Sequence, residues 1–577
     1  MTYSQLVERS DQMATALIQA GVAKGEYVGV SFPRTIDLIT SLLGVLKAGA
    51  AYVPLDPAYP VGRLETMVSS AAIRHVVCAA DQSGRLHGVR VIVPDACNAD
   101  RTRFPEVRDD DSVYAIFTSG STGTPKAAGV RHSGFHNLLS WYASELALNE
   151  SDRTLVISSP GFDLTQKNLF VPLLTGGTLI LDEGETYDIT RILRLIRENS
   201  VTLVNCTPSA FHPLVDSAAG NGFQDISSLR FAVLGGEPIS IPRLRGWLEH
   251  PNCRAEVVNS YGPTECTDIC LFHRMGRENL DAFPFVPLGR EIPDVRVTIR
   301  DEDLEVLPDG EIGELCISGA GVGEGYLYDP EKTRGRFAGW NPACEVATPL
   351  LYRTGDLAKR LPCGTFEFRG RADHQVKVNG HRIELGEIEI ALSKHDEVHE
   401  AVVTCRDHRL TAHVRGVADV ESMKQHLSAL LPAYMVPSEF RMTSEFPLTP
   451  NGKVDRKTLE NIAPEPERNS HPVIPASEFE TKILALWTEL LECPVADPTA
   501  NFFDLGGGSI HLAIMHVRLK ELSGREFPIT DLFANPSARS IAAMLTENGM
   551  AKTTNAARER AMQARKGISN LRRPTSR

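Results

Sequence analysis

A chain of 577 residues is longer than one hydrophobic core usually supports, so several domains are expected. Its 42% hydrophobic and 23% charged residues are ordinary for a soluble globular enzyme. The formal net charge of −13 argues against broad nucleic-acid binding.

The composition also argues against membrane insertion and secretion. No apolar run reaches the length of about eighteen residues that suggests a transmembrane helix. The first residues, MTYSQLVERSDQ, lack the basic and then apolar pattern of a signal peptide. The 11 cysteines are scattered without a Cys-x-x-Cys pair, which favours reduced thiols over a disulfide scaffold or a zinc site. We therefore expect a cytoplasmic protein that binds neither membrane nor nucleic acid.

From residue 1 to about 370, short apolar runs alternate with segments of helical period such as Ile189–Asn199. This alternation predicts an α/β fold of layered helices and largely parallel sheets. The runs predicted as strands are Tyr27–Ser31, Val76–Cys78, Val91–Val93, Val113–Phe117, Leu155–Ser158, Gly177–Leu181, Leu203–Cys206 and Phe231–Leu234.

A loop rich in hydroxyls and glycine follows the strand predicted at Val113–Phe117 and ends at Lys126. Glycine lets the backbone turn tightly and approach a ligand. Backbone N–H groups, hydroxyls and a lysine together form an anion cradle, so the loop predicts polyphosphate binding, although its spacing is not that of a Walker A motif. A flexible surface loop is the alternative. The candidate residues are Thr118, Ser119, Gly120, Ser121, Thr122, Gly123 and Lys126.

The last third of the chain contains smaller units. Residues 374 to about 461 mix strand and helix patterns, and four prolines between Pro464 and Pro475 indicate a linker. Residues 476–547 predict a helical bundle with helices at Phe479–Leu491 and Leu512–Leu522. The basic tail 548–577 is expected to be disordered or to be part of a helix that belongs to a longer protein.

Several motifs occur in a fixed order, and together they resemble the adenylation domains of nonribosomal peptide synthetases, which belong to the adenylate-forming enzymes. The resemblance covers residues 1 to about 460, and NFFDLGGGSI at Asn501–Ile510 resembles the attachment motif of a peptidyl carrier protein. The adenylation motifs are LKAGAAYVPLD at Leu46–Asp56, the 118–126 loop, NSYGPTE at Asn259–Glu265, YRTGDL at Tyr352–Leu357, GRADHQVKVNGHRIELGEIE at Gly370–Glu389 and NGKVDR at Asn451–Arg456.

The resemblance implies an α/β core, a small mobile α+β subdomain and an all-α four-helix carrier domain. The boundaries that it implies are 1–372 for the adenylation core, 373–462 for the mobile subdomain, 463–475 for the linker, 476–547 for the carrier domain and 548–577 for the tail.

The resemblance also implies roles on the nucleotide side. Asp356 would accept the ribose hydroxyls, Arg371 would lie near ribose and phosphate, and Tyr261 would lie beside adenine. Gly262 and Thr264 complete the nucleotide-binding set with the 118–126 loop residues, and Glu265 would be the magnesium-side carboxylate. Taken singly, an Asp or Glu in such a turn is more often a cap or a surface charge, and the joint pattern favours function.

The resemblance also implies two half-reactions, adenylation and thioester formation, and a small subdomain that moves between them. Lys453 follows a turn dipeptide and would reach the substrate carboxylate and phosphate during adenylation. Asp373 matches the hinge, and the Lys377–Gly380 face would be presented for thioester formation. Ser509, at the expected start of a helix, would carry 4′-phosphopantetheine.

The specificity pocket is predicted to be polar. Asp163 would pair with the substrate α-ammonium, which favours an amino acid. Lys167 and Asp268 either neutralise each other, or one of them binds a charged or polar substrate group. A medium or long polar substrate side chain is expected, with Glu or Gln ahead of a basic one, because a hydrophobic one would leave polar groups unpaired. The lining residues are Asp163, Leu164, Lys167, Ser209, Val233, Gly235, Ser260, Asp268 and Ile269.

The implied function is activation of an amino acid with ATP and Mg²⁺ to an aminoacyl-AMP, followed by transfer to the phosphopantetheine thiol on Ser509. The implied partners are a phosphopantetheinyl transferase and condensation or other assembly-line domains, and the resemblance allows an MbtH-like protein. An acyl-CoA synthetase-type ligase is one alternative, which Asp163 and the fused carrier motif oppose. A catalytically silent docking scaffold is the other.

Overall fold

The structure is a computed structural model. The part of the chain that it describes comprises 1–94, 103–120, 123–184, 187–339, 350–373, 375–378, 380–406, 409–447, 454–461, 475–491, 495–502, 505, 507, 509–529, 531–532 and 535–545. Ser121, Thr122 and Lys453 therefore lie outside the described residues, as do the tail 548–577 and most of the predicted linker.

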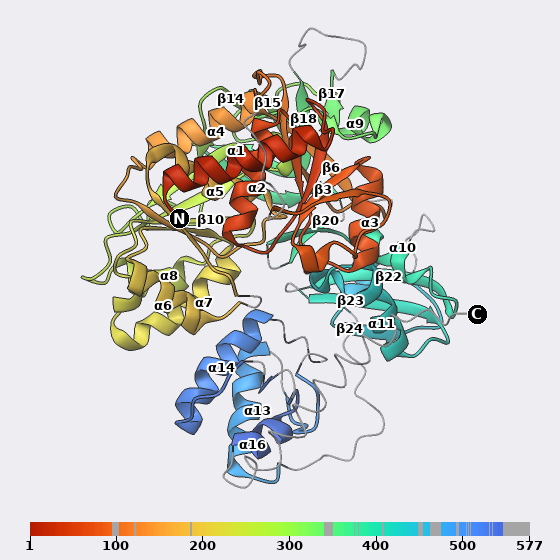
Figure 1. The fold of residues 1–577 in the computed structure, drawn as a ribbon. Coiled ribbons are helices and arrows are strands. Elements are labelled where there is room, and N and C mark those ends of the chain that lie inside the picture. The colour runs from red at the N-terminus through yellow and green to blue at the C-terminus, as the bar shows by residue number, and fades with distance from the viewer. Residues whose placement is uncertain are drawn as a thin grey trace.

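Two seven-stranded sheets form the N-terminal part of the molecule (Figure 1). Five neighbouring strands are parallel in each sheet, and an antiparallel pair completes each one. The first sheet runs β16 (Gly325–Tyr326), β6 (Lys126–Arg131), β5 (Ser112–Thr118), β2 (Ala51–Pro54), β1 (Tyr27–Ser31), β3 (His75–Cys78) and β4 (Arg90–Ile92). The second runs β13 (Arg290–Glu291), β12 (Leu271–Met275), β11 (Glu256–Tyr261), β10 (Phe231–Gly235), β9 (Leu203–Cys206), β7 (Arg153–Val156) and β8 (Thr178–Leu181).

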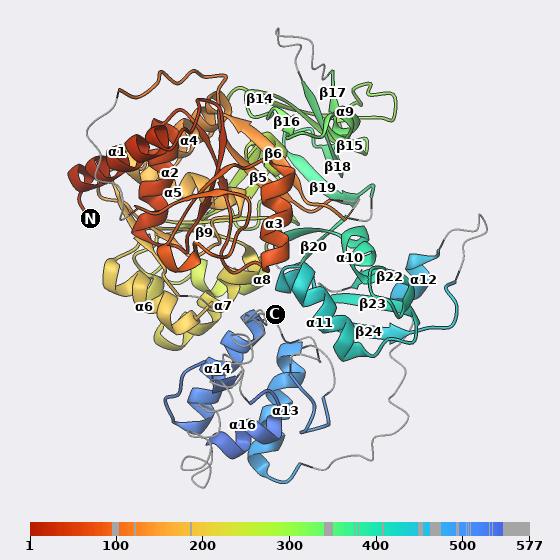
Figure 2. The same cartoon turned by 45° about the vertical axis from the view of Figure 1, so that its right-hand side comes forward.

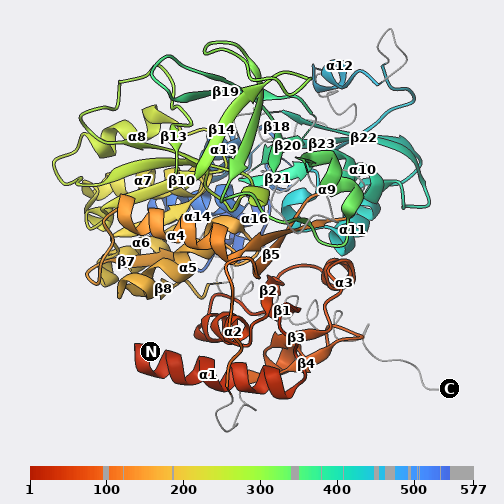
Figure 3. The same ribbon diagram turned by 90° about the horizontal axis from the view of Figure 1, so that it is seen from above.

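Two helices lie between the sheets and join them into one core. Helix α4 (His132–Glu145) contacts β5 and β6, α5 (Asp163–Thr175) contacts β7, β8 and β9, and the two helices contact each other. Phe135 of α4 makes edge-to-face contacts with Phe170 of α5 and with Tyr114 of β5. The outer helices are α1 (Tyr3–Gln19), α2 (Ile36–Lys47), α3 (Val61–Ser70), α6 (Ile189–Asn199), α7 (Pro208–Ala218) and α8 (Ile241–Leu248) (Figure 3).

The predicted α/β alternation is confirmed here, with strand ends that differ by one or two residues. β1, β9 and α6 begin and end where the sequence predicts. The alternation stops earlier than expected, however, because residues 295–371 form an antiparallel sheet. It consists of β14 (Val295–Arg300), β15 (Gly313–Gly319), β17 (Phe337–Ala338), β18 (Leu351–Arg360) and β19 (Phe366–Arg371), with α9 (Pro330–Arg336) beside it.

A small α+β unit follows β19. The hairpin β20 (Gln375–Val378) and β21 (His381–Glu384) leads into α10 (Leu385–Leu392). A three-stranded sheet of β22 (Val398–Arg406), β23 (Arg409–Gly416) and β24 (Glu439–Met442) carries α11 (Val420–Leu430) and α12 (Arg456–Asn461). We call residues 375–461 the small domain. Helix α3 of the first sheet lies against it (Figure 2).

The C-terminal part is helical. The described residues contain α13 (Glu478–Leu491), α14 (Ser509–Ser523) and α16 (Ala538–Leu545), which pack around Trp487 and Phe502. Helix α14 contacts α6 and α7 of the core (Figure 1). No helix of the described residues is both long and apolar enough to cross a membrane. The domain boundaries given above remain predictions.

Candidate active site

The candidate residues of the core gather at one edge of the sheets. Strands of a parallel sheet point the same way, so the loops after their carboxyl ends share an edge, where ligands bind in α/β proteins. β5 ends at Thr118, where the phosphate loop begins, and β11 ends at Tyr261, four residues before Glu265. Gly235 ends β10, and Ser209 lies in the first turn of α7, directly after β9.

The residues predicted to bind the nucleoside form one hydrogen-bonded group. Pairing of β18 with β19 places Asp356 opposite Arg371. Asp356 accepts a hydrogen bond from the Tyr261 hydroxyl at 2.5 Å and one from the Arg371 guanidinium. The ammonium of Lys377 lies 5.7 Å from the centre of the Tyr261 ring, and burial lowers the pKa of Lys377. The structure therefore brings together four predicted residues from four strands.

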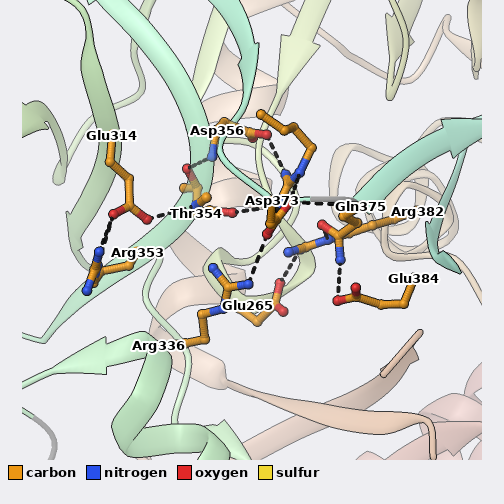
Figure 4. Close-up of polar contacts among 12 residues, drawn as sticks. Glu265, Glu314, Arg336, Arg353, Thr354, Asp356, Asp373, Gln375, Arg382 and Glu384 are labelled. Atoms are coloured by element: carbon orange, nitrogen blue, oxygen red, sulfur yellow. Dashed lines mark hydrogen bonds and ion pairs between the residues drawn. The ribbon is translucent and has the colours of Figure 1, made fainter. Parts of the chain in front are cut away.

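Asp373, the predicted hinge, is bound to two arginines in this group (Figure 4). Arg371 Nε donates to Asp373 Oδ1 at 2.7 Å, and Arg336 donates to Oδ2 at 3.1 Å. Burial opposes ionisation of Asp373, but the two guanidinium groups outweigh it and lower its pKa to about 2. A charged Asp373 thus ties the end of β19 to α9 in this pose.

The side chain of Glu265 is completely buried, with 0% of its surface exposed. It accepts hydrogen bonds from the Tyr326 hydroxyl at 2.6 Å and from Arg382 of β21 at 3.0 Å. Burial opposes its ionisation, but Arg382, Lys126 and Tyr326 together lower its pKa to about 2. A permanently charged carboxylate beside an anion cradle fits one side of a Mg²⁺–phosphate complex. No cluster of three or more His, Cys, Asp or Glu able to hold a metal occurs in the ranges described.

The described residues of the phosphate loop include a tight turn and two buried polar side chains. A Cβ atom added to Gly120 would lie 1.9 Å from the Thr124 carbonyl oxygen, so this close turn requires glycine. The Thr118 hydroxyl is buried and has no hydrogen-bond partner among the described residues. Lys126 is buried close by, and burial lowers its pKa. A buried hydroxyl without a partner, a tight glycine turn and a buried lysine fit a nucleotide phosphate chain.

Asp163 is the first residue of α5, where the helix dipole favours its negative charge. Its Oδ1 accepts from the Leu164 N–H at 2.7 Å, and its Oδ2 accepts from the Thr264 hydroxyl at 2.6 Å. Each carboxylate oxygen has a second lone pair, so the arrangement leaves acceptor capacity for an ammonium group. This geometry suits the predicted role of Asp163.

The polar residues of the predicted pocket are already paired within the protein. The Lys167 ammonium lies 2.5 Å from Asp268 Oδ2, with the two side chains 0% and 9% exposed. The Ser260 hydroxyl donates to the Leu234 carbonyl at 3.1 Å, and the Ser209 hydroxyl donates to Glu237. Of the three alternatives left open by the sequence, the internal Lys167–Asp268 pair is the one present. The argument that a hydrophobic substrate would leave these groups unpaired therefore loses its basis.

The remaining pocket residues are small or apolar. Val233 and Ile269 are buried, and Leu164 is half-buried. A Cβ atom at Gly235 would lie 2.6 Å from the Ser260 hydroxyl, so glycine is what leaves room at this wall. Gly262 is also confined, since its Cβ would lie 2.0 Å from the Asp268 carbonyl.

A cavity of about 2560 Å³ connects the pocket to the C-terminal helices. Its lining includes Phe162 and Ser209 from the core, His381 and Tyr434 from the small domain, and Gly507 next to the start of α14. His381 stacks on Tyr434 and meets Phe162 edge to face. Helix α14 begins at Ser509, as the sequence predicts, two residues after Gly507 of the lining.

Four functional candidates escaped the sequence analysis. Arg382 and Glu387 lie within the 370–389 motif, which could have pointed to them, and Glu237 follows the Gly235–Gly236 pair. Glu237 accepts from the Gly380 N–H at 2.5 Å and from the Ser209 N–H at 3.1 Å, so it links the small domain to the pocket. Arg63, on α3, carried no sequence pattern that pointed to it.

Family models match three parts of the chain. Residues 1–327 match the AMP-binding enzyme model, residues 387–453 match the AMP-binding enzyme C-terminal domain, and residues 481–545 match the phosphopantetheine attachment site.

The chain is similar to two curated peptide synthases. It is 36% identical to bacitracin synthase 3 of Bacillus licheniformis over 556 residues, which are 94% of this chain and 9% of that protein. It is 34% identical to tyrocidine synthase 1 of Brevibacillus parabrevis over 565 residues, 94% of this chain and 50% of that protein. The chain thus spans half or less of the length of these relatives.

Two solved structures share the fold of this chain and contain an adenylation domain and a PCP domain. One is a holo nonribosomal peptide synthetase protein containing adenylation and PCP domains, bound to a vinylsulfonamide inhibitor. It is 27% identical with a TM-score of 0.80, over 94% of this chain and 92% of that one. The other is an artificially fused adenylation–PCP didomain from Klebsiella oxytoca, 25% identical with a TM-score of 0.69, over 86% of this chain and 93% of that one. The chain belongs to the AMP-binding enzyme family and has the adenylation and carrier domains of a nonribosomal peptide synthetase.

Proposed function

We propose that this chain activates an amino acid with ATP, releases pyrophosphate, and transfers the aminoacyl group to a phosphopantetheine thiol on Ser509. One observation carries the proposal. Asp163 is hydrogen-bonded to Thr264, the neighbour of Glu265, and a cavity lined by Leu164 and Ser209 of the adjoining pocket extends to Gly507 next to the start of α14.

Each group has a distinct task in the first half-reaction. A carboxylate and ATP repel each other, so the barrier falls when they are aligned and their charge is met by preplaced cations. Asp163 would hold the α-ammonium, Asp356 the ribose, and the phosphate loop with Lys126 the phosphates. Glu265 would hold Mg²⁺, which neutralises phosphate charge when bound. Lys453 would supply a further cation at the reacting oxygens.

The second half-reaction would use the pose described here. The hairpin β20–β21 reaches the site, with Gly380 bound to Glu237 and Lys377 beside Tyr261. A phosphopantetheine arm supplies a thiol at the end of a long tether, and the cavity gives that tether a path. Asp373 would be the hinge between this pose and the one that presents Lys453.

The proposed partners are a phosphopantetheinyl transferase, the downstream condensation or other domains of an assembly line, and an MbtH-like protein. We place the chain in the cytoplasm, which supplies ATP and keeps thiols reduced. None of the eight cysteines within the described ranges forms a disulfide. The proposed substrate is an amino acid, because Asp163 offers a carboxylate to its ammonium, and a polar side chain remains a hypothesis for the exchange screen below.

The test is an ATP–pyrophosphate exchange screen over amino acids and fatty acids, with and without CoA, followed by intact mass of the pantetheinylated chain. We expect exchange with one or a few amino acids and a matching mass gain. Lys453→Ala should abolish exchange. Ser509→Ala should abolish the mass gain and keep exchange, whereas Ser523→Ala at the other end of α14 should keep both. Exchange only with fatty acids and CoA would favour an acyl-CoA ligase, and no exchange at all would favour a scaffold.

A further inference from the structure

Helix α5 and the loop after β11 are joined at two points along the predicted substrate pocket. Asp163 and Lys167 are four residues apart on α5, so they lie on the same face of the helix, one turn apart. Asp163 accepts a hydrogen bond from Thr264 of the loop. Lys167 is paired with Asp268, which follows four residues later in the same loop. The Asp268 carboxylate therefore lies about one helical turn beyond the carboxylate that would hold the substrate ammonium, on the side where the substrate side chain would lie.

Contacts within the protein use the side-chain protons of this pocket. The Lys167 ammonium is 0% exposed and donates to Asp268 Oδ2 and to a main-chain carbonyl of its own helix. The hydroxyls of Ser260 and Ser209 donate to a main-chain carbonyl and to Glu237. The two hydroxyls therefore offer a substrate lone pairs and no protons, and the ammonium is out of reach.

One acceptor of the pocket is left over. Asp268 is bound to Lys167 through Oδ2, and its Oδ1 accepts no hydrogen bond from a residue in the described ranges. The Asp268 side chain is 9% exposed. Burial raises the pKa of Asp268 to about 6, so the carboxylate is ionised at higher pH and then only accepts hydrogen bonds. A carboxylate oxygen in such a pocket is stabilised by a donor from the substrate.

The charges around Asp268 oppose a charged substrate side chain. Lys167 and Asp163 are the charged groups that shift the pKa of Asp268. With the α-ammonium of an amino acid on Asp163, two carboxylates would face two cations, and the charges would balance. A substrate carboxylate would repel Asp268, and a cationic side chain would add a buried charge without a partner.

Among uncharged donors, a hydroxyl fits these contacts better than a carboxamide does. A carboxamide could donate its N–H to Asp268, but its carbonyl would find no donor on Lys167, Ser209 or Ser260. A buried carbonyl without a donor is costly. A hydroxyl supplies the one proton that the pocket lacks and brings no carbonyl.

We infer that Asp268 selects an amino acid whose side chain carries a hydroxyl group, and that this hydroxyl donates to Asp268 Oδ1. The inference rests on the proposed function, because it takes the pocket beside Asp163 as the place of the substrate side chain. Lys167 acts through Asp268 and is a positioning residue, since it holds Oδ2 and leaves Oδ1 to the substrate.

The test measures ATP–pyrophosphate exchange of the purified full chain at a pH well above the pKa of Asp268. Each hydroxyl compound is compared with an analogue that lacks the hydroxyl. The pairs are serine and α-aminobutyrate, threonine and valine, homoserine and norvaline, and tyrosine and phenylalanine. In the pair that contains the best substrate, we expect kcat/KM of the hydroxyl compound to be higher by about tenfold or more, because the analogue leaves the acceptor unpaired.

Variants of the pair show whether Asp268 causes this preference. In Asp268→Asn, Lys167 would bind the carboxamide oxygen and the NH₂ group would face the substrate, so the hydroxyl preference should disappear. Asp303→Asn, at an exposed acid in the loop after β14, is the matched control and should keep it. The double variant Lys167→Met, Asp268→Leu buries no charge and should prefer the analogue without the hydroxyl. It decides the question if Asp268→Asn does not fold.

The outcomes separate this inference from the proposed function. A best substrate with an apolar, charged or carboxamide side chain would overturn the inference and leave amino acid activation standing. A hydroxyl preference that persists in the folded variants of Asp268 would do the same. Absence of exchange with every amino acid would overturn both.

Discussion

Two walls of the site each contain a buried carboxylate, and the two behave oppositely. Glu265, on the magnesium side, has its pKa lowered to about 2. Asp268, three residues later in the substrate pocket, has its pKa raised to about 6, because burial and nearby Asp163 outweigh the pull of Lys167. Burial is nearly complete at both, so burial alone does not decide the ionisation of an acid.

The difference lies in the number of cations and in where they come from. Glu265 has Lys126 from the core and Arg382 from the small domain. Asp268 has one cation, Lys167, which comes from the neighbouring helix α5. The charge of the magnesium side therefore depends on the pose of the small domain, whereas the charge of the substrate pocket is set within the core.

The largest effect is expected from breaking the ion pair between Lys167 and Asp268. Lys167→Met leaves Asp268 buried without a cation, and removal of one partner of a buried ion pair costs about 3–5 kcal/mol. The free energy of unfolding from urea denaturation should fall by that amount. In the double variant Lys167→Met, Asp268→Leu, most of the loss should be recovered because no charge remains buried. A double variant as unstable as the single one would show that the pair matters for packing and not for charge.

The next effect concerns the magnesium side. Glu265→Gln removes the carboxylate that would hold Mg²⁺, and stabilisation by a metal ion contributes several kcal/mol to such reactions. We expect the rate of ATP–pyrophosphate exchange to fall about a hundredfold or more, with no rescue by added Mg²⁺. Glu302→Gln, an exposed acid in the loop after β14, serves as control and should keep the wild-type rate. A near-normal rate of ATP–pyrophosphate exchange in Glu265→Gln would contradict the proposed role of Glu265 in holding Mg²⁺.

The smallest effect is the pH dependence of stability, and it separates the two acids. Asp268 has a raised pKa in the folded state, so the folded chain holds a proton that the unfolded chain loses. Stability from this group therefore falls as pH rises from about 4 through 6, by at most about 1.4 kcal/mol per pH unit. The contribution of Glu265 to stability depends on pH in the opposite direction, because its pKa is lowered in the folded state. It is lost only as pH falls below about 4.5 towards 2. Urea unfolding at pH 4 to 7 should show a steeper decline in the wild type than in Asp268→Asn, and identical slopes would contradict the assignment.

Local patterns in the sequence were enough to predict much of the fold. Alternating apolar runs located β1 and β9, and helical period located α6, because these patterns depend only on neighbouring residues. The antiparallel sheet after residue 295 escaped prediction, since its strands pair across long loops and show no alternation with helices.

The sequence likewise predicted only some features of the candidate site. The loop rich in hydroxyls and glycine pointed to Thr118, and the resemblance to adenylation domains pointed to Tyr261 and Glu265. The pairing of charged side chains in the site could not be predicted from the sequence. Lys167 could have faced the substrate, yet it pairs with Asp268, 101 residues away.

The sequence by itself determined which chemical groups this protein carries and in which order they follow its strands. Only the tertiary structure decided which charges meet, as when Glu387 meets both Gly120 and Arg63, 267 and 324 residues away in the chain. The physical reason is that period and turn chemistry are local properties, whereas the pairing of buried charges depends on how whole elements pack and on the pose of a separate domain.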